Sequence, residues 1–286
     1  MSSDTSLLTL SAPAKVNLSL RVLGRRDDGF HTVETRMCPV SIADELTLEA
    51  LPGASRLEFT CSDSTLPTDE SNLVVKAVRA YEARVHEKRA WRIHLQKHVP
   101  SGAGLGGGSS DAAAVLRGMN QLSGSPLSVD ELCEVAATIG SDVPFFIHGK
   151  VCDATGRGEQ VVPVDFPHQL TLVLIKPPFG IPTPWAYKNW RTSEELTGVT
   201  YQVQSCPWGD MVNDLERPVF QKYLLLPSLK MWLLAQPGVA AALMSGSGST
   251  MFAVVPDEAS AQALAKKAQE WCGPTAWVQV VHTFTS

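Results

Sequence analysis

The sequence lacks the features that mark a membrane-spanning, secreted or generally nucleic-acid-binding chain. It contains no run of about 18 apolar residues, so no segment is expected to cross a membrane. The opening MSSDTSLLTL has an acid and no basic residue, which does not match a secretory signal. Its 24 Lys and Arg residues are outnumbered by 29 Asp and Glu residues, which excludes a general surface for nucleic acid. Any phosphate binding must therefore be local.

The sequence also lacks a CxxC pair and any fixed-period repeat. Its six cysteines are scattered singly at positions 38, 61, 133, 152, 206 and 272. This pattern favours free thiols in a reducing cytoplasm over a zinc site. With 286 residues, 44% hydrophobic and 19% charged, the chain has the composition of a soluble globular protein, and its length favours two domains.

The pattern of apolar residues predicts an α+β fold with mixed sheets. Half-solvated antiparallel strands are expected at 7–12, 16–23, 45–50 and 56–61, and further strands at 91–99, 170–177 and 277–284. Helices are expected at 72–84, 111–122, 128–138 and 257–272. Ser128 begins a capping box, and Asp257 is the predicted cap of the last helix. A domain boundary is expected near residues 160–165.

The stretch PSGAGLGGGSSDAA, residues 100–113, matches parts of three phosphate-binding motifs. Gly102, Gly104 and Gly107 have the dinucleotide-binding spacing, but the strand before them alternates with charged residues and no acid ends a second strand downstream. Ser109 follows Gly108 directly, so the lysine of a Walker A loop is missing. No His-Arg-Asp or Asp-Phe-Gly accompanies it, which excludes the protein-kinase loop. Its patterned flanks exclude a linker.

The same stretch still has the chemistry of a phosphate cradle. Glycines allow close backbone approach, and Ser109, Ser110 and Asp111 are residue types that start helices. The free N–H groups and the dipole at a helix N-terminus attract anions. We therefore expect a triphosphate to bind where the helix begins.

Four motifs occur along the chain: residues 13–35, the glycine stretch 100–113, GSDVPFF (140–146) and LMSGSGSTMF (243–252). In these motifs and in their order the chain resembles the GHMP kinases, and the resemblance covers nearly its whole length. The resemblance is strongest to the member that phosphorylates a cytidine diphosphate-linked methylerythritol on the non-mevalonate route to isoprenoids. A mevalonate- or homoserine-type kinase is the alternative. Within residues 191–230 only VNDLE (212–216) matches.

The resemblance implies a two-domain GHMP kinase fold. An N-terminal ATP-binding domain, resembling domain 2 of ribosomal protein S5, is expected at residues 1–162, and a ferredoxin-like α+β substrate domain at residues 163–286. The partner is a small molecule rather than a nucleic acid or a membrane, and a monomer or weak homodimer is expected.

The resemblance also assigns catalytic and nucleotide-binding residues. Asp142 matches the catalytic aspartate and Lys15 the lysine beside it; from composition alone they would be a helix cap and a surface lysine. Asn72 and Lys97 are expected near the adenosine of ATP, although a helix cap and a strand-end charge are the simpler interpretations. Mg²⁺ is expected to bridge the phosphates, with no metal ligand assigned. The expected phosphate cradle comprises Pro100, Ser101, Gly102, Ala103, Gly104, Leu105, Gly106, Gly107, Gly108, Ser109 and Ser110.

The cytidine substrate is expected to bind at a second group of residues. Phe30 stands where the family usually has tyrosine, and it keeps the stacking surface without the hydroxyl. His31 is expected to hydrogen-bond the cytosine edge, and Tyr187 to stack as the second ring. Asn17, Thr183 and Lys188 complete the predicted substrate contacts, and the glycine motif Ser245–Thr250 is expected to close the site.

Overall fold

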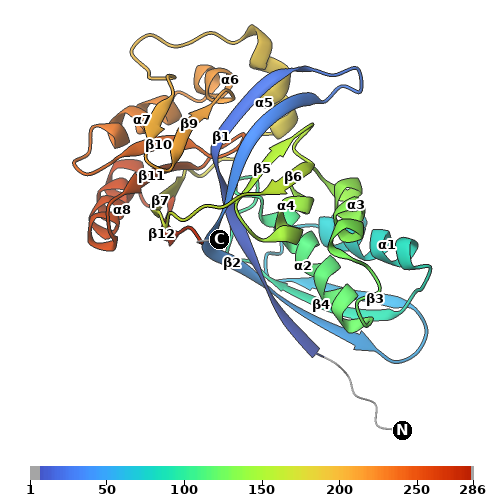
Figure 1. The fold of residues 1–286 in the computed structure, drawn as a ribbon. Coiled ribbons are helices and arrows are strands. Elements are labelled where there is room, and N and C mark those ends of the chain that lie inside the picture. The colour runs from blue at the N-terminus through green and yellow to red at the C-terminus, as the bar shows by residue number, and fades with distance from the viewer. Residues whose placement is uncertain (1–6, 285–286) are drawn as a thin grey trace.

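The computed structural model describes residues 7–284 as an α+β protein built on two sheets (Figure 1). Residues 1–6 lie outside the described residues, and with them the first part of the opening segment that does not match a secretory signal. No helix between residues 7 and 284 is long and apolar enough to cross a membrane. The predicted fold class is confirmed.

Two long antiparallel strands, β1 (Leu7–Arg25) and β2 (His31–Leu51), run through the length of the molecule (Figure 1). The predicted strands at 7–12 and 16–23 are thus one continuous strand. Pro13 lies at a shift of the β1–β2 register, between Pro13 and Ala14. A strand tolerates proline at such an irregularity because the missing N–H donor interrupts no regular ladder there.

The first sheet has the order β3-β4-β2-β1-β9-β8, and off this path β5 pairs with β2 and β6 pairs with β5. The additional strands are β3 (Arg56–Cys61), β4 (Ala90–Gln96), β5 (Cys152–Thr155), β6 (Gln160–Pro163), β8 (Gln204–Cys206) and β9 (Gly209–Asn213). The antiparallel prediction is wrong for residues 56–61, because β3 pairs with β4 in parallel. Helix α1 (Leu73–Val85) connects these two strands, and such a crossover returns the chain in the same direction.

Four helices of the first half pack together against this sheet. With α1 they are α2 (Gly107–Leu122), α3 (Val129–Ile139) and α4 (Val143–His148). Alanines 112–114 on α2 are fully buried in the core they form with the sheet. The capping box of Ser128 and Glu131 at the start of α3 is present as predicted.

The second sheet has the order β10-β11-β7-β12, with antiparallel neighbours throughout. Its strands are β7 (Thr171–Lys176), β10 (Ala241–Met244), β11 (Met251–Val255) and β12 (Trp277–His282). The helices of this half are α5 (Thr183–Asn189), a short 3₁₀ turn η1 (Trp190–Thr192), α6 (Glu216–Lys222), α7 (Leu225–Leu234) and α8 (Glu258–Cys272). This order of strands and helices is ferredoxin-like, as expected. Asp257 caps α8 by accepting the Ser260 N–H at 2.7 Å.

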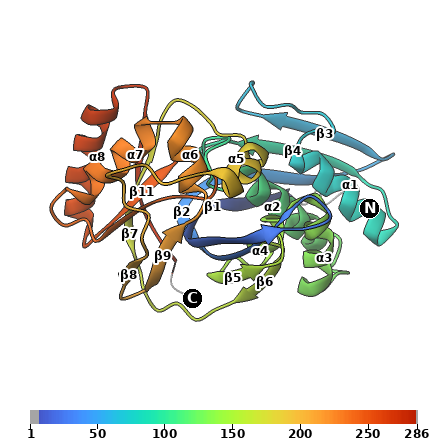
Figure 2. The same cartoon turned by 90° about the horizontal axis from the view of Figure 1, so that it is seen from above.

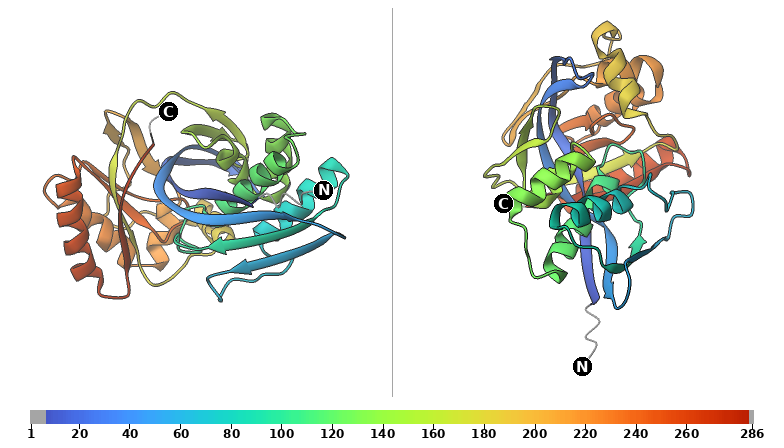
Figure 3. Two further views of the ribbon diagram at one scale, coloured as in Figure 1. Left: turned by 90° about the horizontal axis from the view of Figure 1, so that it is seen from below. Right: turned by 90° about the vertical axis from the view of Figure 1, so that its right-hand side faces the viewer.

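A shared core joins the two halves. In β7, Leu172 and Leu174 pack toward β1 and β2, whereas Val173 and Ile175 pack toward the helices of the second half. Both faces of the strand are therefore buried, which explains its nearly continuous apolar sequence. Seen from above, α5 lies where the two halves meet (Figure 2), and seen from below, α8 lies on the outer side of the second sheet (Figure 3).

The predicted boundary at residue 162 stays a prediction. Strands β8 and β9 follow that residue in the chain, yet β9 pairs with β1 at Ser19–Val212 and Leu20–Asn213. The chain thus crosses back to the first sheet after β7 before it completes the second sheet.

Candidate active site

A cavity of about 1460 Å³ is lined by residues from both halves of the chain. Typical pockets for one small ligand measure roughly 300–1,000 Å³, so this cavity has room for two substrates. Every predicted site residue except Ser110 lines it: Lys15, Asn17, Phe30, His31, Asn72, Lys97, Pro100 to Ser109, Asp142, Thr183, Tyr187 and Lys188. Positions far apart in the sequence are therefore brought to one place.

The N-terminus of α2 opens into this cavity. The helix begins at Gly107, and its N-cap is Gly106 with φ 73°, so the expectation that Ser109, Ser110 or Asp111 caps it is wrong. A Cβ atom on Gly106 would lie 2.8 Å from the Phe146 ring. Glycine therefore suits both the left-handed backbone and the close contact. The first N–H groups of the helix have no intrahelical partner and can bind an anion.

Ser110 differs from the rest of the predicted cradle. Its side chain is 1% exposed and does not line the cavity. Its hydroxyl has no hydrogen-bond partner among the described residues. As the fourth residue of α2, its N–H is already used by the Gly106 carbonyl, at 2.9 Å. The helical turn thus directs this serine inward and leaves Ser109 at the cavity.

The two glycine-rich loops touch each other through their backbones. The Ser245 hydroxyl donates to the Gly104 carbonyl at 2.9 Å, and the Thr250 N–H donates to the Ala103 carbonyl at 3.1 Å. A Cβ atom on Gly104, whose φ is 77°, would lie only 2.2 Å from the Ser245 carbonyl oxygen. The loop 245–250 therefore covers the loop 100–106 with no space for a side chain between them.

Lys15 and Asp142 form an ion pair inside the cavity. Lys15 is 3% exposed, and its Nζ lies 3.5 Å from Oδ2 of Asp142. The backbone N–H of Lys15 donates to the Leu105 carbonyl at 2.9 Å, which fixes β1 to the glycine loop. Asp142 precedes α4 but makes no side-chain cap bond. Its carboxylate is therefore free for other contacts in the cavity.

Asn17 holds the Lys15 ammonium from the other side. The two residues are two positions apart on β1 and so point to the same face. Lys15 Nζ donates to Asn17 Oδ1 at 2.6 Å, and Asn17 Nδ2 donates to the Thr35 hydroxyl at 2.7 Å. Thr35 in turn donates to the Ser19 carbonyl at 2.6 Å. This chain leaves one orientation for the Asn17 amide.

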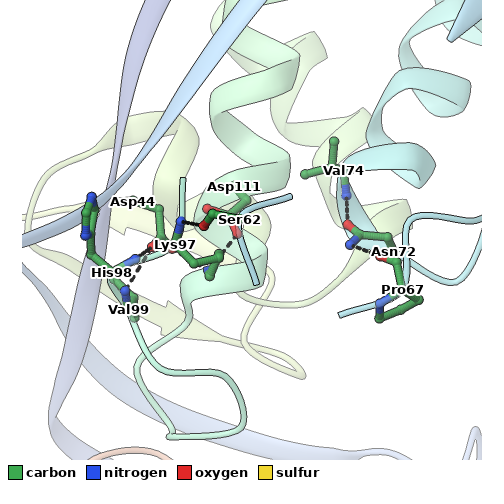
Figure 4. Close-up of polar contacts among 9 residues, drawn as sticks. All are labelled: Asp44, Ser62, Pro67, Asn72, Val74, Lys97, His98, Val99 and Asp111. Carbon is green, nitrogen blue, oxygen red and sulfur yellow. Dashed lines mark hydrogen bonds and ion pairs between the residues drawn. The ribbon is translucent and has the colours of Figure 1, made fainter. Parts of the chain in front are cut away.

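Asn72 lines the other end of the cavity and is also a helix cap. Its side-chain oxygen accepts the Val74 N–H at 2.9 Å, and its amide donates to the Pro67 carbonyl at 2.7 Å (Figure 4). Asn72 is therefore a helix cap, as the simpler interpretation of the sequence predicts. Leu73, the residue after the cap, lies beside the start of α2. A Cβ atom on Gly108 would lie 3.6 Å from the Leu73 side chain.

Lys97 is not a strand-end surface charge. Its side chain is 8% exposed, and its ammonium pairs with the carboxylates of Asp44 and Asp111, the latter at 3.0 Å (Figure 4). Burial opposes its charge, but Asp111 and Asp44 together outweigh burial and raise the pKa of Lys97. Asp44 also accepts the backbone N–H groups of His98 and Val99, so it fixes the start of the glycine loop.

Aromatic side chains from β2, α5 and η1 gather at another part of the cavity. The rings of His31 and Tyr187 lie 5.4 Å apart, and Trp190 meets His31 edge-on at 6.3 Å. Burial and the Arg25 charge lower the pKa of His31, so at neutral pH its ring has one donor and one acceptor nitrogen. Burial and, to a lesser extent, the Asp142 charge raise the pKa of Tyr187, which keeps its hydroxyl neutral.

Phe30 is half exposed, and the Arg157 guanidinium lies 5.1 Å from the centre of its ring. The hydroxyl of Thr183, on α5, hydrogen-bonds the hydroxyl of Ser247, in the second glycine loop, at 2.8 Å. Lys188, from the same helix, also lines this end. The arrangement offers stacking surfaces, a neutral imidazole and a cation.

Several cavity residues were missed from the sequence. Arg157, Trp190 and Arg191 line the cavity, and Asp44 holds Lys97 and the glycine loop. They lie in segments without recognisable spacing, and folding alone brings them to the site. Gly246 and Ser247, which also line the cavity, belong to the glycine motif expected there.

Comparison with known proteins identifies the family. The models of the GHMP kinases N terminal domain and the GHMP kinases C terminal match residues 72–150 and 208–273. The chain is 42% identical to the 4-diphosphocytidyl-2-C-methyl-D-erythritol kinase of Methylacidiphilum infernorum, with 97% of each chain covered. It is 39% identical to that of Geobacter metallireducens, with 91% of this chain and 93% of the relative covered.

Solved structures agree with this assignment. A crystal structure of 4-(cytidine 5'-diphospho)-2C-methyl-D-erythritol kinase matches with a TM-score of 0.79 at 33% identity, covering 96% of this chain and 99% of the other. A homoserine kinase from Cytophaga hutchinsonii matches with a TM-score of 0.71 at 20% identity over 100% of this chain and 96% of the other, which shows the shared fold alone. By sequence over its whole length and by structure, the chain belongs to the 4-diphosphocytidyl-2-C-methyl-D-erythritol kinase family of the GHMP kinases.

Proposed function

We propose that the protein transfers the γ-phosphoryl group of ATP to the 2-hydroxyl of 4-diphosphocytidyl-2-C-methyl-D-erythritol, a step of the non-mevalonate route to isoprenoid precursors. The observation that carries this proposal is that a single cavity contains a helix N-terminus suited to phosphates, a Lys–Asp pair and a ring-lined end. Phosphoryl transfer needs chiefly in-line positioning and charge stabilisation, and these groups supply both.

In this proposal ATP lies along the loop 100–109, with its phosphates at the free N–H groups of α2. Asn72 and Lys97 line the adenosine side. Because both Asp44 and Asp111 hold the Lys97 ammonium, we assign Lys97 mainly to positioning the glycine loop. The contact between Gly104 and Ser245 holds the second glycine loop against this loop.

Asp142 accepts or orients the proton of the acceptor hydroxyl, and Lys15 neutralises the charge that develops on the transferring phosphoryl group. A loose transition state delays proton loss, so orientation by Asp142 matters more than its basicity. Asn17 holds Lys15 in place, and its fixed amide faces the acceptor.

At the other end, His31 pairs with the cytosine edge through its donor and acceptor nitrogens, while Phe30 and Tyr187 stack on the base. Stacking of this kind contributes about 1–3 kcal/mol per base in nucleic-acid complexes. Thr183 and Lys188 contact the diphosphate or the erythritol unit. The mevalonate- or homoserine-type alternative is not favoured, because an acceptor without a base leaves these rings unused.

Mg²⁺ is expected to bridge the ATP phosphates and to neutralise their charge. Between residues 7 and 284 no group of three or more His, Cys, Asp or Glu side chains could hold a metal ion. We therefore assign no protein ligand to the ion. A cytoplasmic location is inferred from free cysteines at all six positions. A monomer or weak homodimer remains the predicted assembly.

The test is a panel of acceptors with ATP. The purified protein is incubated with the cytidine substrate, mevalonate or homoserine, ADP release is measured, and phosphorus NMR identifies the product. Phosphorylation of the cytidine substrate alone is the expected result. Equal or greater turnover of another acceptor would contradict the proposal. Asp142→Asn in the same assay shows whether the turnover belongs to this site.

A further inference from the structure

The segment Val212–Glu216, at the end of β9 and the start of α6, has no place in the proposed reaction, because none of its residues lines the cavity. Two of its three polar side chains are nevertheless buried, and Asp214 is partly buried. Asn213 is 3% and Glu216 is 1% exposed. Burying polar groups costs free energy unless each finds a partner, so the partners of these side chains indicate what the segment holds in place.

Asn213 holds the beginning of the second glycine loop. Its Nδ2 donates to the carbonyl of Met244 at 2.7 Å and to that of Gly246 at 2.8 Å. Its Oδ1 accepts the Leu215 N–H at 2.9 Å. The Asn213 Nδ2 group thus donates to both carbonyls that flank Ser245. Because Oδ1 accepts the Leu215 N–H, the amide group cannot rotate by 180° without losing these bonds.

The same segment is attached to β1, the strand that carries Lys15. Leu20 pairs with Asn213 in parallel, and the Asp214 N–H donates to the Leu20 carbonyl at 2.9 Å. The carboxylate of Asp214 accepts the Val22 N–H at 2.8 Å. Asn213 therefore has a fixed position relative to β1.

Glu216 supports the loop from its other side. One carboxylate oxygen accepts the Met244 N–H at 2.9 Å, and the other pairs with Lys230 Nζ at 2.5 Å. Lys230 is 1% exposed, so the pair is closed to water. Met244 is thus held through its N–H by Glu216 and through its carbonyl by Asn213.

The held loop forms the wall beside the Lys15 ammonium. A Cβ atom on Gly246 would lie 3.3 Å from Lys15 Nζ and 3.3 Å from Asn17 Oδ1. It would also lie 3.2 Å from the Gly104 carbonyl. Movement of this loop therefore changes the space in which the Lys15–Asp142 pair sits.

We propose that Asn213 is a positioning residue for phosphoryl transfer. It fixes the Gly246 backbone against Lys15 and so keeps the Lys15 ammonium beside the phosphoryl group that is transferred. This inference rests on the proposed role of Lys15. It predicts an effect on turnover rather than on nucleotide affinity, because the hydrogen bonds of Asn213 go to Met244, Gly246 and Leu215 and not to Asn72 or Lys97.

The test is Asn213→Asp in the purified enzyme, which replaces two donors by carboxylate oxygen facing two carbonyls. Since a displacement of about 1 Å can cost on the order of 100-fold in rate, we expect kcat to fall at least about 10-fold. The dissociation constant of ATP, measured by calorimetry, should stay within about threefold, because the hydrogen bonds of Asn213 go to Met244, Gly246 and Leu215 and not to the first turn of α2, which offers its N–H groups to the phosphates. Thermal melting confirms that the variant is folded.

The matched control is Asp210→Asn on the same strand. Asp210 is exposed and accepts the Ser205 hydroxyl at 2.8 Å. It does not line the cavity, so this change should leave kcat unaltered. If Asn213→Asp does not fold, Gly246→Ala disturbs the same contact directly and should lower kcat in the same way. A folded Asn213→Asp enzyme with wild-type kcat overturns the inference, whereas an inactive wild-type enzyme would instead refute the proposed function.

Discussion

Replacing Gly104 by alanine should separate the two glycine loops. Gly104 has φ 77°, and an alanine Cβ there would lie 2.2 Å from the Ser245 carbonyl oxygen. Such contacts essentially never fall below 3.0 Å, so the loops must move apart by at least 0.8 Å, the difference between 3.0 and 2.2 Å. The neighbouring atoms are backbone and cannot rotate away.

The expected loss follows from that displacement. A shift of about 1 Å at a reacting group can cost on the order of 100-fold in rate, so kcat of Gly104→Ala should fall by about that factor. The left-handed backbone conformation costs alanine a further 1–2 kcal/mol or so of stability. Steady-state kinetics with the cytidine substrate gives kcat, and thermal melting gives the stability.

Two other glycines separate these effects. Gly124→Ala, at φ 83° in the turn after α2, has no atom within 4 Å of the added Cβ, so it should lose stability alone. Gly102→Ala, at φ 63° in the same loop, also meets no atom within 4 Å and should lower kcat far less than Gly104→Ala. If Gly104→Ala retains kcat within threefold of the Gly102→Ala value, the close packing of the two loops is not what positions the phosphates.

Three further changes test other parts of the site. Asp142→Asn should lower kcat by roughly 10²–10⁴-fold and leave the KM for ATP nearly unchanged, because a positioned proton acceptor contributes about that much; near-normal turnover would remove Asp142 from the reaction. His31→Ala should weaken discrimination between the cytidine substrate and its uridine analogue, measured as the ratio of kcat/KM values, and an unchanged ratio would exclude base recognition by His31. Burial, opposed by Lys97, raises the pKa of Asp111 from 3.8 to about 7. The folded protein therefore keeps a proton that the unfolded chain releases, so stability falls as the pH rises from about 4 to 7. Asp111→Asn cannot titrate, and the wild-type melting temperature should decline relative to it between pH 5 and 7; parallel curves would contradict this sign.

Much of the fold follows from short-range signals in the sequence. The capping box at Ser128 and the cap at Asp257 predict helix starts because their hydrogen bonds reach only three residues ahead. Alternation in 56–61 predicts a strand with one buried face, but it contains no information on the direction of its neighbour. The parallel pairing of β3 with β4 is decided by the crossover through α1.

The residues of the site likewise fall into those that the sequence predicts and those that only the fold places. The glycine stretch, Lys15 and Asp142 can be found from motifs, because each motif is a run of adjacent residues. The position of Lys97 could not, since its partner Asp44 lies 53 positions away on another strand. An isolated lysine at a strand end is usually a surface charge, and only the packing of β2, β4 and α2 around it excludes water.

By itself, the sequence determined several of the elements, the family and the loop at which phosphates are expected to bind, because these depend on periodicity, caps and contiguous motifs. Only the tertiary structure decided that α2 starts at Gly107, that Lys97 is buried between Asp44 and Asp111 and that Asn213 holds the second loop against Lys15. Each of these depends on contacts between segments distant in the chain. Such contacts form only when burial of the shared core fixes the two sheets relative to each other.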